Sequence, residues 1–393
     1  MPQVNDASIV SSAYVHIPFC RRRCFYCDFP VFVVGDRLRG ENSGSISRYV
    51  DILCQEITTA PVFSQPLKTI FFGGGTPSLL STEQLAQILQ VLEKRFGMTA
   101  DAEISMEVDP GTFDLAHITG YRDVGVNRVS LGVQALQAEL LKVAGRSHSV
   151  EDIFAAVELI HQAKIPEFSI DLISGLPHQS LEQWQDSLTK VVAIAPTHIS
   201  IYDLTIEPGT TFGRYYQPGD SPLPTDATTV KMYRLAQQVL TTAGYQHYEI
   251  SNYAQIGHQC QHNRVYWENR PYYGFGMGAA SYVEGKRFTR PRTTKDYYQW
   301  VEAGCVIDCE VTPPQEVLLD TLMLGLRLAE GVNLTRLSEK FGQQPLEVIH
   351  KCLKPHVEQG LVEITEERLR LSDPEGFLFS NVVLADLFNW LEA

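Results

Sequence analysis

The chain has 393 residues, of which 44% are hydrophobic and 20% are charged, and its formal net charge is -14. A chain of this length exceeds the usual size of a single hydrophobic core, so we expect one large domain and a smaller one. The acidic balance disfavours a general nucleic-acid binder, because neutralising phosphates is the main source of that affinity.

The cysteines and the apolar runs predict the compartment. Eight cysteines are spread along the chain and do not resemble the dense framework of a secreted disulfide protein. No N-terminal leader pattern is evident, and no stretch approaches the roughly 18 to 20 apolar residues of a membrane span. We therefore expect a cytoplasmic protein with reduced thiols. Cys54 and Cys352 fit buried positions, while a pairing of Cys305 with Cys309 stays open.

In chain order, short β-branched runs alternate with amphipathic stretches as far as about residue 206, the pattern of parallel βα units. The predicted strands cover residues 13–19, 69–72, 103–108, 128–133, 168–173 and 198–205. The predicted helices cover residues 46–58, 82–96, 150–164 and 181–192, with Ser149 and Ser180 at N-cap positions. Six right-handed βα units predict a partial (β/α)6 barrel of the TIM type over residues 1–210. Residues 32–47, rich in Gly and Ser, predict a mobile surface loop.

Beyond the predicted barrel, proline and glycine mark a linker and a change of pattern. We expect a linking region over residues 211–312 and a smaller, mostly helical domain over 313–393. Helices at 314–328, 334–341 and 346–359, followed by a two-strand ribbon at 361–371, resemble a winged helix. The ribbon is rich in glutamate, which favours a packing or partner-docking role over DNA contact.

A CxxxCxxC motif directly follows the first predicted strand and supplies Cys20, Cys24 and Cys27. A [4Fe–4S] cluster normally takes four thiolates, so three leave one iron open to an exchangeable ligand. The alternative is a zinc site closed by His16 or Asp28, although no second knuckle of matching spacing occurs. The three arginines inside the motif are expected to lower the pKa of the thiols and to offset an anionic cluster.

Polar and glycine-rich motifs follow the other predicted strands. Because chemistry in such barrels sits at the carboxyl ends of the strands, these motifs are expected to face one mouth. Glycines 73 to 75 allow a close backbone approach and are expected to present carbonyl and N–H groups to a ligand. Together with the side chains that follow, they predict a polar ligand site. These side chains are Glu107, Gln134, Arg146 and Asp171.

The cysteine motif, with the aromatic Tyr26 before its last cysteine, and Gly73-Gly-Gly-Thr-Pro77 resemble the radical S-adenosylmethionine superfamily. Further motifs resemble its oxygen-independent coproporphyrinogen III oxidase family from residue 13 to the C-terminus. The resemblance implies a [4Fe–4S] cluster on the three cysteines, completed by S-adenosylmethionine. Tyr14, Gly74 and Glu107 match positions that hold this molecule. Other positions match contacts to a second molecule in the oxidases, and whether one or two bind here stays open. These positions are Tyr26, Gly75, Thr76, Gln134, Arg146 and Asp171.

Two departures separate the chain from the oxidases. Phe29 stands where their motif continues with a fourth cysteine, and only a dozen residues precede the first predicted strand. Residues 262–267 match the HNxxYW motif of the oxidase-like heme chaperones, which also lack that cysteine. An imidazole is a good iron ligand and aromatic rings suit a porphyrin face, so His262 is a candidate axial ligand, with His258 and Cys260 as competitors.

We therefore predict a heme chaperone that binds heme and passes it to an acceptor protein, with an electron donor reducing the cluster. The alternative is an active oxidase of porphyrin biosynthesis that oxidatively decarboxylates coproporphyrinogen III, and the enzymatic role stays open. A third alternative, a DNA-binding redox sensor that uses the winged-helix-like end, is disfavoured by the acidic charge.

Overall fold

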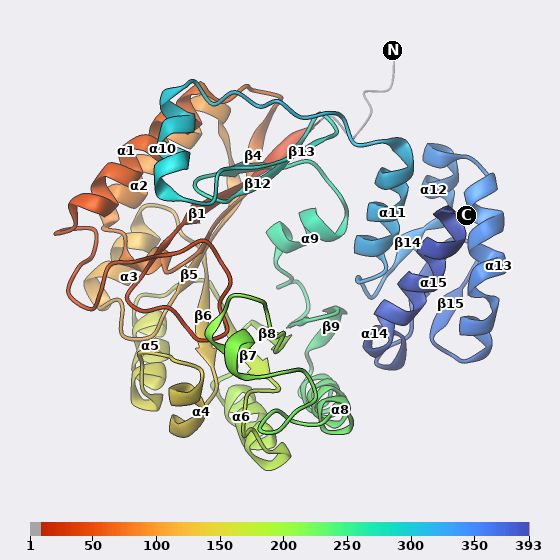
Figure 1. Cartoon of the computed structure of the whole chain (residues 1–393). Coiled ribbons are helices and arrows are strands. Elements are labelled where there is room, and N and C mark those ends of the chain that lie inside the picture. Colours follow the sequence, from red (N-terminus) through yellow and green to blue (C-terminus); the bar gives the residue numbers. More distant parts are fainter. Residues whose placement is uncertain (1–8, 393) are drawn as a thin grey trace. The chain divides into compact units, whose positions relative to one another are not determined.

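The computed structural model describes residues 9–392, and contacts between residues divide the chain into two compact units. The first unit runs to Met232 and resumes over Pro271–Val311, and the second comprises Tyr233–Arg270 and the chain from Thr312 onward (Figure 1). The segment 211–312 is thus shared between the units. The predicted boundaries at residues 210 and 312 stay a prediction.

The first unit is built on a parallel sheet in the order β11-β1-β4-β5-β6-β7-β8. All six predicted strands are present in it, and the partial barrel is confirmed. The strands are β1 (Val10–Ile17), β4 (Ser64–Gly74), β5 (Met98–Val108), β6 (Arg128–Gln134), β7 (Glu167–Ser174), β8 (His198–Asp203) and β11 (Tyr273–Phe275). The sequence did not predict β11, which pairs with β1 from far along the chain.

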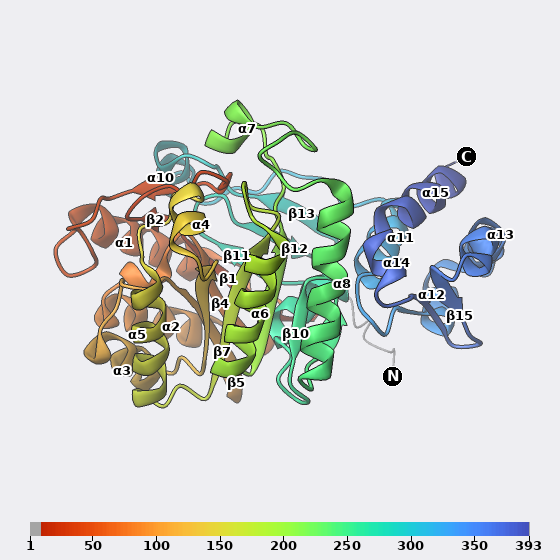
Figure 2. The same ribbon diagram turned by 90° about the horizontal axis from the view of Figure 1, so that it is seen from below.

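Helices lie along one side of this sheet (Figures 1 and 2). They are α1 (Gly44–Thr59), α2 (Thr82–Phe96), α3 (Leu115–Asp123), α4 (Ala138–Val143), α5 (Val150–Gln162) and α6 (Leu181–Ile194). Ser81, Ser149 and Ser180 each close a capping box at the start of a helix, which satisfies N–H groups that the first turn leaves unbonded. The two predicted N-caps are confirmed, whereas α3 and α4 were not predicted.

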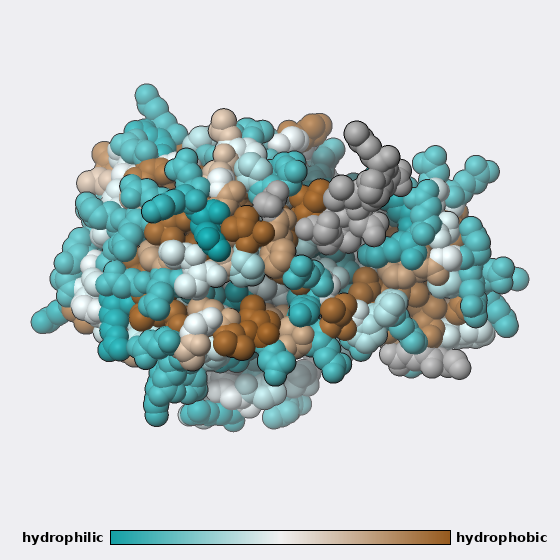
Figure 3. Space-filling model, turned by 90° about the horizontal axis from the view of Figure 1, so that it is seen from above, coloured by the Kyte–Doolittle hydropathy of each residue, from teal (hydrophilic) through white to brown (hydrophobic). Residues whose placement is uncertain are grey.

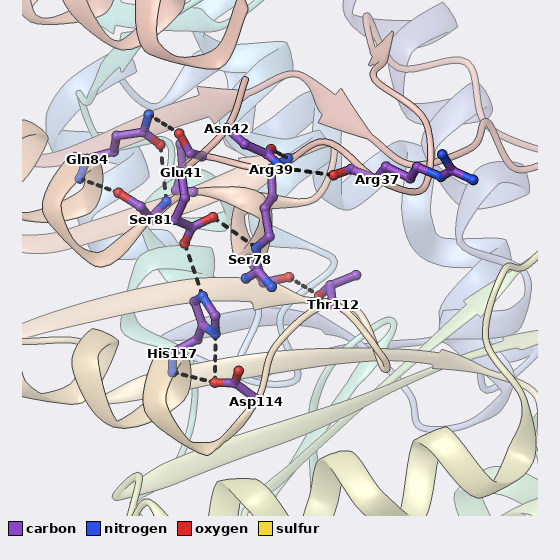
Figure 4. A network of polar contacts seen from close by, with 12 residues as sticks. Arg37, Arg39, Glu41, Asn42, Ser78, Ser81, Gln84, Thr112, Asp114 and His117 are labelled. Carbon is purple, nitrogen blue, oxygen red and sulfur yellow. Dashed lines mark hydrogen bonds and ion pairs between the residues drawn. The ribbon is translucent and has the colours of Figure 1, made fainter. Parts of the chain in front are cut away.

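The loop expected over residues 32–47 is shorter than predicted and is tied to the barrel. Its first residues form β3 (Phe32–Val33), which pairs with β2 (Phe19–Cys20), and α1 begins at Gly44. Gly40 donates its N–H to the carbonyl oxygen of Leu79 at 2.7 Å and accepts from Gln84 at 3.1 Å. Figure 4 shows the polar network that continues from Glu41 through His117. Close packing explains the glycine, since a Cβ at residue 40 would lie 2.2 Å from a backbone nitrogen.

Smaller elements complete the first unit. They are the 3₁₀ helix η2 (Pro77–Leu79), α7 (Thr211–Tyr215), the hairpin of β12 (Ala280–Val283) and β13 (Lys286–Thr289), and α10 (Thr294–Glu302). Arg290, which follows the hairpin, reaches Glu56 on α1 at 2.8 Å, and both side chains are almost completely buried. This ion pair ties the returning segment to the barrel.

The second unit is mostly helical around its own apolar core. Its elements are β9 (Gln246–Glu249), β10 (Asn252–Ala254), α9 (Gln261–Trp267), α11 (Pro314–Gly325), β14 (Val332–Asn333), α12 (Leu334–Phe341), α13 (Gln344–Glu358), β15 (Val362–Ile364), β16 (Arg368–Leu371), α14 (Glu375–Leu378) and α15 (Ser380–Glu392), and α8 (Asp226–Thr242) crosses the boundary between units. Three of these strands form an antiparallel sheet in the order β14-β16-β15. The pair β15 and β16 is the predicted ribbon. Leu322, Ile349 and Leu353 are fully buried in the core of this unit.

Within residues 9–392, no helix combines the length and apolar character that crossing a membrane requires. The face of the molecule in Figure 3 is largely hydrophilic, with apolar residues in separate patches.

Candidate cofactor site

The cysteine loop lies at the carboxyl end of the first strand, as predicted. Cys20 ends β2, and the loop that follows is fixed at its middle, where the Phe25 N–H donates to the Ala144 carbonyl oxygen at 3.0 Å. The Cys27 N–H donates to the Cys24 carbonyl oxygen at 3.3 Å, which closes a turn between these two cysteines. All three cysteines line one cavity of about 430 Å³.

The arginines of the loop support its backbone. Arg21 donates to the Gly111 carbonyl oxygen at 2.7 Å, and Arg23 donates to the Cys27 carbonyl oxygen at 3.1 Å. The expectation that these arginines lower the pKa of the thiols holds for the effect of Arg23 on Cys27, but the net shift of the pKa is upward for both Cys20 and Cys27. Burial raises the pKa of Cys20 to about 12 and also raises the pKa of Cys27, where the opposing effect of Arg23 is smaller. Bound iron would supply the positive charge that holds such thiols as thiolates.

The zinc alternative does not fit the surroundings of His16. Its ring nitrogen Nδ1 is 3.0 Å from the Tyr14 hydroxyl and Nε2 is 3.1 Å from the Pro30 carbonyl oxygen, so both nitrogens are engaged. Of the described residues, no three His, Cys, Asp or Glu side chains converge on one ion position, as a tetrahedral zinc site requires. Three thiols spread around a cavity suit a four-iron cluster better, because each binds a different iron.

The cavity brings together residues from the carboxyl ends of successive strands. Most of the predicted site residues line it, and Tyr14 and His262 do not. Those that line it are Cys20, Cys24, Tyr26, Cys27, Gly74, Gly75, Thr76, Glu107, Gln134, Arg146 and Asp171. Tyr14 lies behind the glycine turn, where a Cβ on Gly73 would come within 3.1 Å of its ring.

The glycine turn allows close approach but does not offer the N–H groups that we expected. Gly74 has φ = 110°, and a Cβ there would lie 2.3 Å from the His16 ring, so no other residue fits. Its N–H donates to Glu107 Oε2 at 2.9 Å. Gly75 and Thr76 donate theirs to carbonyl oxygens of the β1–β2 segment at 2.9 and 2.7 Å. These three N–H groups are therefore not available to the carboxylate of a ligand.

Two buried carboxyl groups face the cavity without an ion-pair partner among the described residues. Burial and the nearby Asp171 raise the pKa of Glu107 to about 8. Burial also raises the pKa of Asp171, although Ser130 donates a hydrogen bond to it. Ionising either group inside the cavity is costly unless a donor or a cation arrives. The pair therefore suits a ligand that carries an amine or hydroxyl groups.

Arg146 joins the cluster loop to the polar side of the cavity. Its guanidinium donates to Asp109 Oδ1 at 2.5 Å, to the Gly132 carbonyl oxygen at 2.9 Å and to Cys24 Sγ at 3.4 Å. Asp109 in turn accepts from the Thr76 hydroxyl at 3.1 Å. Arg146, which lies outside the cysteine motif, is therefore the cation that is hydrogen-bonded to a thiol of the loop.

Sequence reasoning did not select Asp109 or Asp203 as site residues. Both stand at the carboxyl end of a strand and line the cavity; the strand-end rule marks the loop that begins at Asp109, but it does not by itself select the side chain that faces the cavity. Asp203 accepts a short hydrogen bond from the Ser174 hydroxyl, and burial raises its pKa.

His262 lies on α9 in the second unit and is fully buried. Its Nε2 is 2.9 Å from the Tyr266 hydroxyl, and burial lowers the pKa of the imidazole to about 3, which keeps it neutral. The Arg327 guanidinium lies 6.0 Å from the centre of the Trp267 ring. Two residues of the motif are therefore hydrogen-bonded to each other, and His262 Nε2 could bind iron only after separating from the Tyr266 hydroxyl.

Comparison with known proteins identifies the family of the chain. The Radical SAM superfamily matches residues 14–191, and the HemN C-terminal domain matches residues 312–379. The chain is 46% identical to the heme chaperone HemW of Synechocystis sp., with 97% of each chain covered. It is 36% identical to the heme chaperone HemW of Escherichia coli, with 95% of this chain and 97% of that protein covered. The chain belongs to the HemW heme chaperone family.

Membership of the radical S-adenosylmethionine superfamily implies a [4Fe–4S] cluster and S-adenosylmethionine, which removes the zinc alternative. The structure of coproporphyrinogen III oxidase (HemN) from Escherichia coli superposes with a TM-score of 0.84, covering 98% of this chain and 91% of that chain. At 24% sequence identity this likeness shows a shared fold and leaves the reaction open.

Proposed function

We propose that this member of the HemW family binds heme and transfers it to an acceptor protein. The observation that carries the proposal is the similarity to the heme chaperones over 97% of both chains, which includes the cysteine loop and the HNxxYW segment. Phe29, where the oxidases continue their motif with cysteine, is 56% exposed and supplies no further thiolate.

Cys20, Cys24 and Cys27 would hold the cluster, and S-adenosylmethionine would complete it from the cavity. When bound, the cluster supplies one electron at a time to the sulfonium centre of that molecule. Glu107 and Asp171 would accept hydrogen bonds from its amine or ribose hydroxyls, since neither carboxyl has an ion-pair partner among the described residues. Arg146 would fix the loop through Cys24 and hold Asp109 beside Thr76. A second molecule of S-adenosylmethionine is left open.

His262 is the proposed axial ligand of heme, and Tyr266 and Trp267 offer aromatic faces. His262 Nε2 is hydrogen-bonded to the Tyr266 hydroxyl, so heme iron could bind this nitrogen only by displacing the hydroxyl. The free cysteines agree with the reducing, cytoplasmic compartment that we expect. The heme acceptor and the electron donor for the cluster belong to the same proposal.

Titration of the reconstituted chain with ferric heme under anaerobic conditions tests the proposal. We expect saturation at one heme per chain, retention of that heme through gel filtration and its release to apomyoglobin, used as a probe acceptor. Absence of a saturable absorption change would contradict heme carriage. A spectrum unchanged in His262→Ala would remove the axial assignment and leave heme carriage standing.

A further inference from the structure

Arg327 lies beside the HNxxYW segment, and both belong to the second unit. Its guanidinium carbon is 6.0 Å from the centre of the Trp267 ring, at the outer range of a cation–π contact. The main chain at Arg327 is fixed, because its carbonyl oxygen accepts from the Ile250 N–H at 3.0 Å. Arg264 of α9 reaches Glu330, which follows Arg327 closely in the chain, at 2.6 Å. Arg327 is therefore held next to the motif by its own main chain and by the pairing of α9 with Glu330.

The guanidinium of Arg327 has few hydrogen bonds for a half-buried cation. Its Nε is buried and has no partner among the described residues. Its Nη2 is 3.5 Å from Asn381 Oδ1, and no carboxylate in the described part of the chain lies within ion-pair distance. Glu249 attracts the charge from further away, but burial raises the pKa of Glu249 to about 7, so only part of the Glu249 population is ionised at neutral pH. Buried N–H groups normally have an acceptor, so this one favours an anionic ligand.

Two other arginines stand on α9 or directly after it, and carboxylates compensate both. Arg264 pairs with Glu268 at 2.8 Å as well as with Glu330. Arg270, just beyond the helix, pairs with Glu268 at 2.8 Å. Of these three arginines, Arg327 is therefore the one whose charge stays available to a ligand.

The open edge of the Arg327 guanidinium is the edge that binds carboxylates. Arg234, elsewhere in the same unit, shows the geometry: its Nε and Nη2 donate to the two carboxylate oxygens of Glu375, each at 2.8 Å. Such a pair of parallel hydrogen bonds is strong and specific for a planar anion. In Arg327 the same edge carries an unbonded Nε and one long contact to Asn381. A carboxylate placed there would complete both hydrogen bonds.

We propose that Arg327 binds a propionate of the heme whose iron is assigned to His262, and so selects a porphyrin with a free carboxylate. The inference rests on the proposed function and keeps its axial ligand. Trp267 follows His262 by five residues of α9, a rise of about 7.5 Å. Propionates branch from the rim of the macrocycle, away from the iron, so iron at His262 and a carboxylate beyond Trp267 are compatible with one ligand. The Trp267 ring supplies an aromatic face for the macrocycle.

Arg327→Gln tests the inference, because it removes the charge and keeps a polar side chain. Ferric heme is expected to bind this variant about tenfold more weakly, the loss of a charge-assisted contact, with unchanged absorption bands because His262 still ligates the iron. Arg327→Lys, which keeps the charge but not the planar fork, is expected to lie between the two. Arg336→Gln is the matched control, since Arg336 is an exposed arginine of α12 in the same unit and is expected to change nothing.

The iron complex of protoporphyrin IX dimethyl ester separates a propionate contact from a merely structural role, because its side chains carry no charge. The unaltered chain is expected to prefer heme over this diester by about tenfold or more, whereas Arg327→Gln is expected to bind both alike. Equal affinity of the unaltered chain for the two porphyrins, a comparison that needs no variant, would overturn the inference while heme carriage stands. The same holds if Arg327→Gln weakens both by one factor. If the unaltered chain binds no heme, the proposed function itself fails.

Discussion

Glu107 makes the binding of S-adenosylmethionine depend on pH. Its pKa is raised to about 8 by burial and by Asp171, so at pH 7 only about one Glu107 in eleven is ionised. An ionised carboxylate accepts hydrogen bonds from an amine or a ribose hydroxyl at both oxygens, whereas the protonated form has lost part of that capacity. Binding that favours the ionised form therefore strengthens as pH rises, by roughly tenfold between pH 7 and pH 9.

Glu107→Gln tests this reasoning because the amide copies the shape of the protonated acid and still accepts from the Gly74 N–H. We measure the affinity of the reconstituted variant for S-adenosylmethionine by equilibrium dialysis. We expect it to lack the roughly tenfold gain between pH 7 and pH 9 that the unaltered chain shows. The variant is expected to match the unaltered chain near pH 6. Titration of the ligand's own amine affects both proteins equally and cancels in the comparison.

The control is Glu103→Gln, the same change on the same strand at a position that does not line the cavity. It is expected to retain the pH dependence of the unaltered chain. Equal pH dependence in Glu107→Gln and the unaltered chain would refute the role given to this carboxyl. Cluster content, measured as iron and sulfide at each pH, has to be constant for the comparison to hold.

The remaining predictions concern the cluster, the barrel and the heme ligand. Cys24→Ala is expected to lose bound iron and sulfide after reconstitution, whereas Cys352→Ala, a buried cysteine of the second unit, is expected to keep them; equal loss would contradict the assignment. Arg290→Met strands a buried carboxylate and is expected to lower the free energy of unfolding by about 3–5 kcal/mol in urea titration. Arg370→Met, at an exposed ion pair, is expected to cost under about 1 kcal/mol, and similar values for both would show that burial does not decide the cost. His262→Ala is expected to shift the heme absorption bands at unchanged cluster content, and an unshifted spectrum would exclude it as ligand.

The fold was predictable where a pattern repeats. Six parallel strands and four helices followed from alternating β-branched and amphipathic runs, and serine caps marked helix starts correctly. The strand β11 (Tyr273–Phe275) was not predictable from the sequence. It is only three residues long, it lies in a glycine-rich aromatic run, and it pairs with β1, which is distant in sequence. The six-residue helix α4 is likewise too short to show a period.

The sequence predicted which residues line the site better than it predicted their pKa shifts and hydrogen-bond partners. Parallel strands bring their carboxyl ends together, so residues spaced along the sequence were expected, correctly, to line one cavity. The net rise in the pKa of the Cys27 thiol was not predicted, because burial outweighs the lowering effect of Arg23. The N–H groups of the glycine turn were predicted to be available, but packing gives them partners within the chain. Burial and partner choice depend on neighbours that no local pattern reveals.

Heme carriage is tested most directly by one anaerobic comparison. The chain, with its cluster reconstituted and S-adenosylmethionine and a reductant present, receives heme in one sample and coproporphyrinogen III in another. We expect saturable binding of one heme per chain, its release to apomyoglobin, and no vinyl-bearing porphyrin product. Conversion of coproporphyrinogen III to a vinyl-bearing product, without saturable heme binding, would contradict the account and make the chain an oxidase despite Phe29.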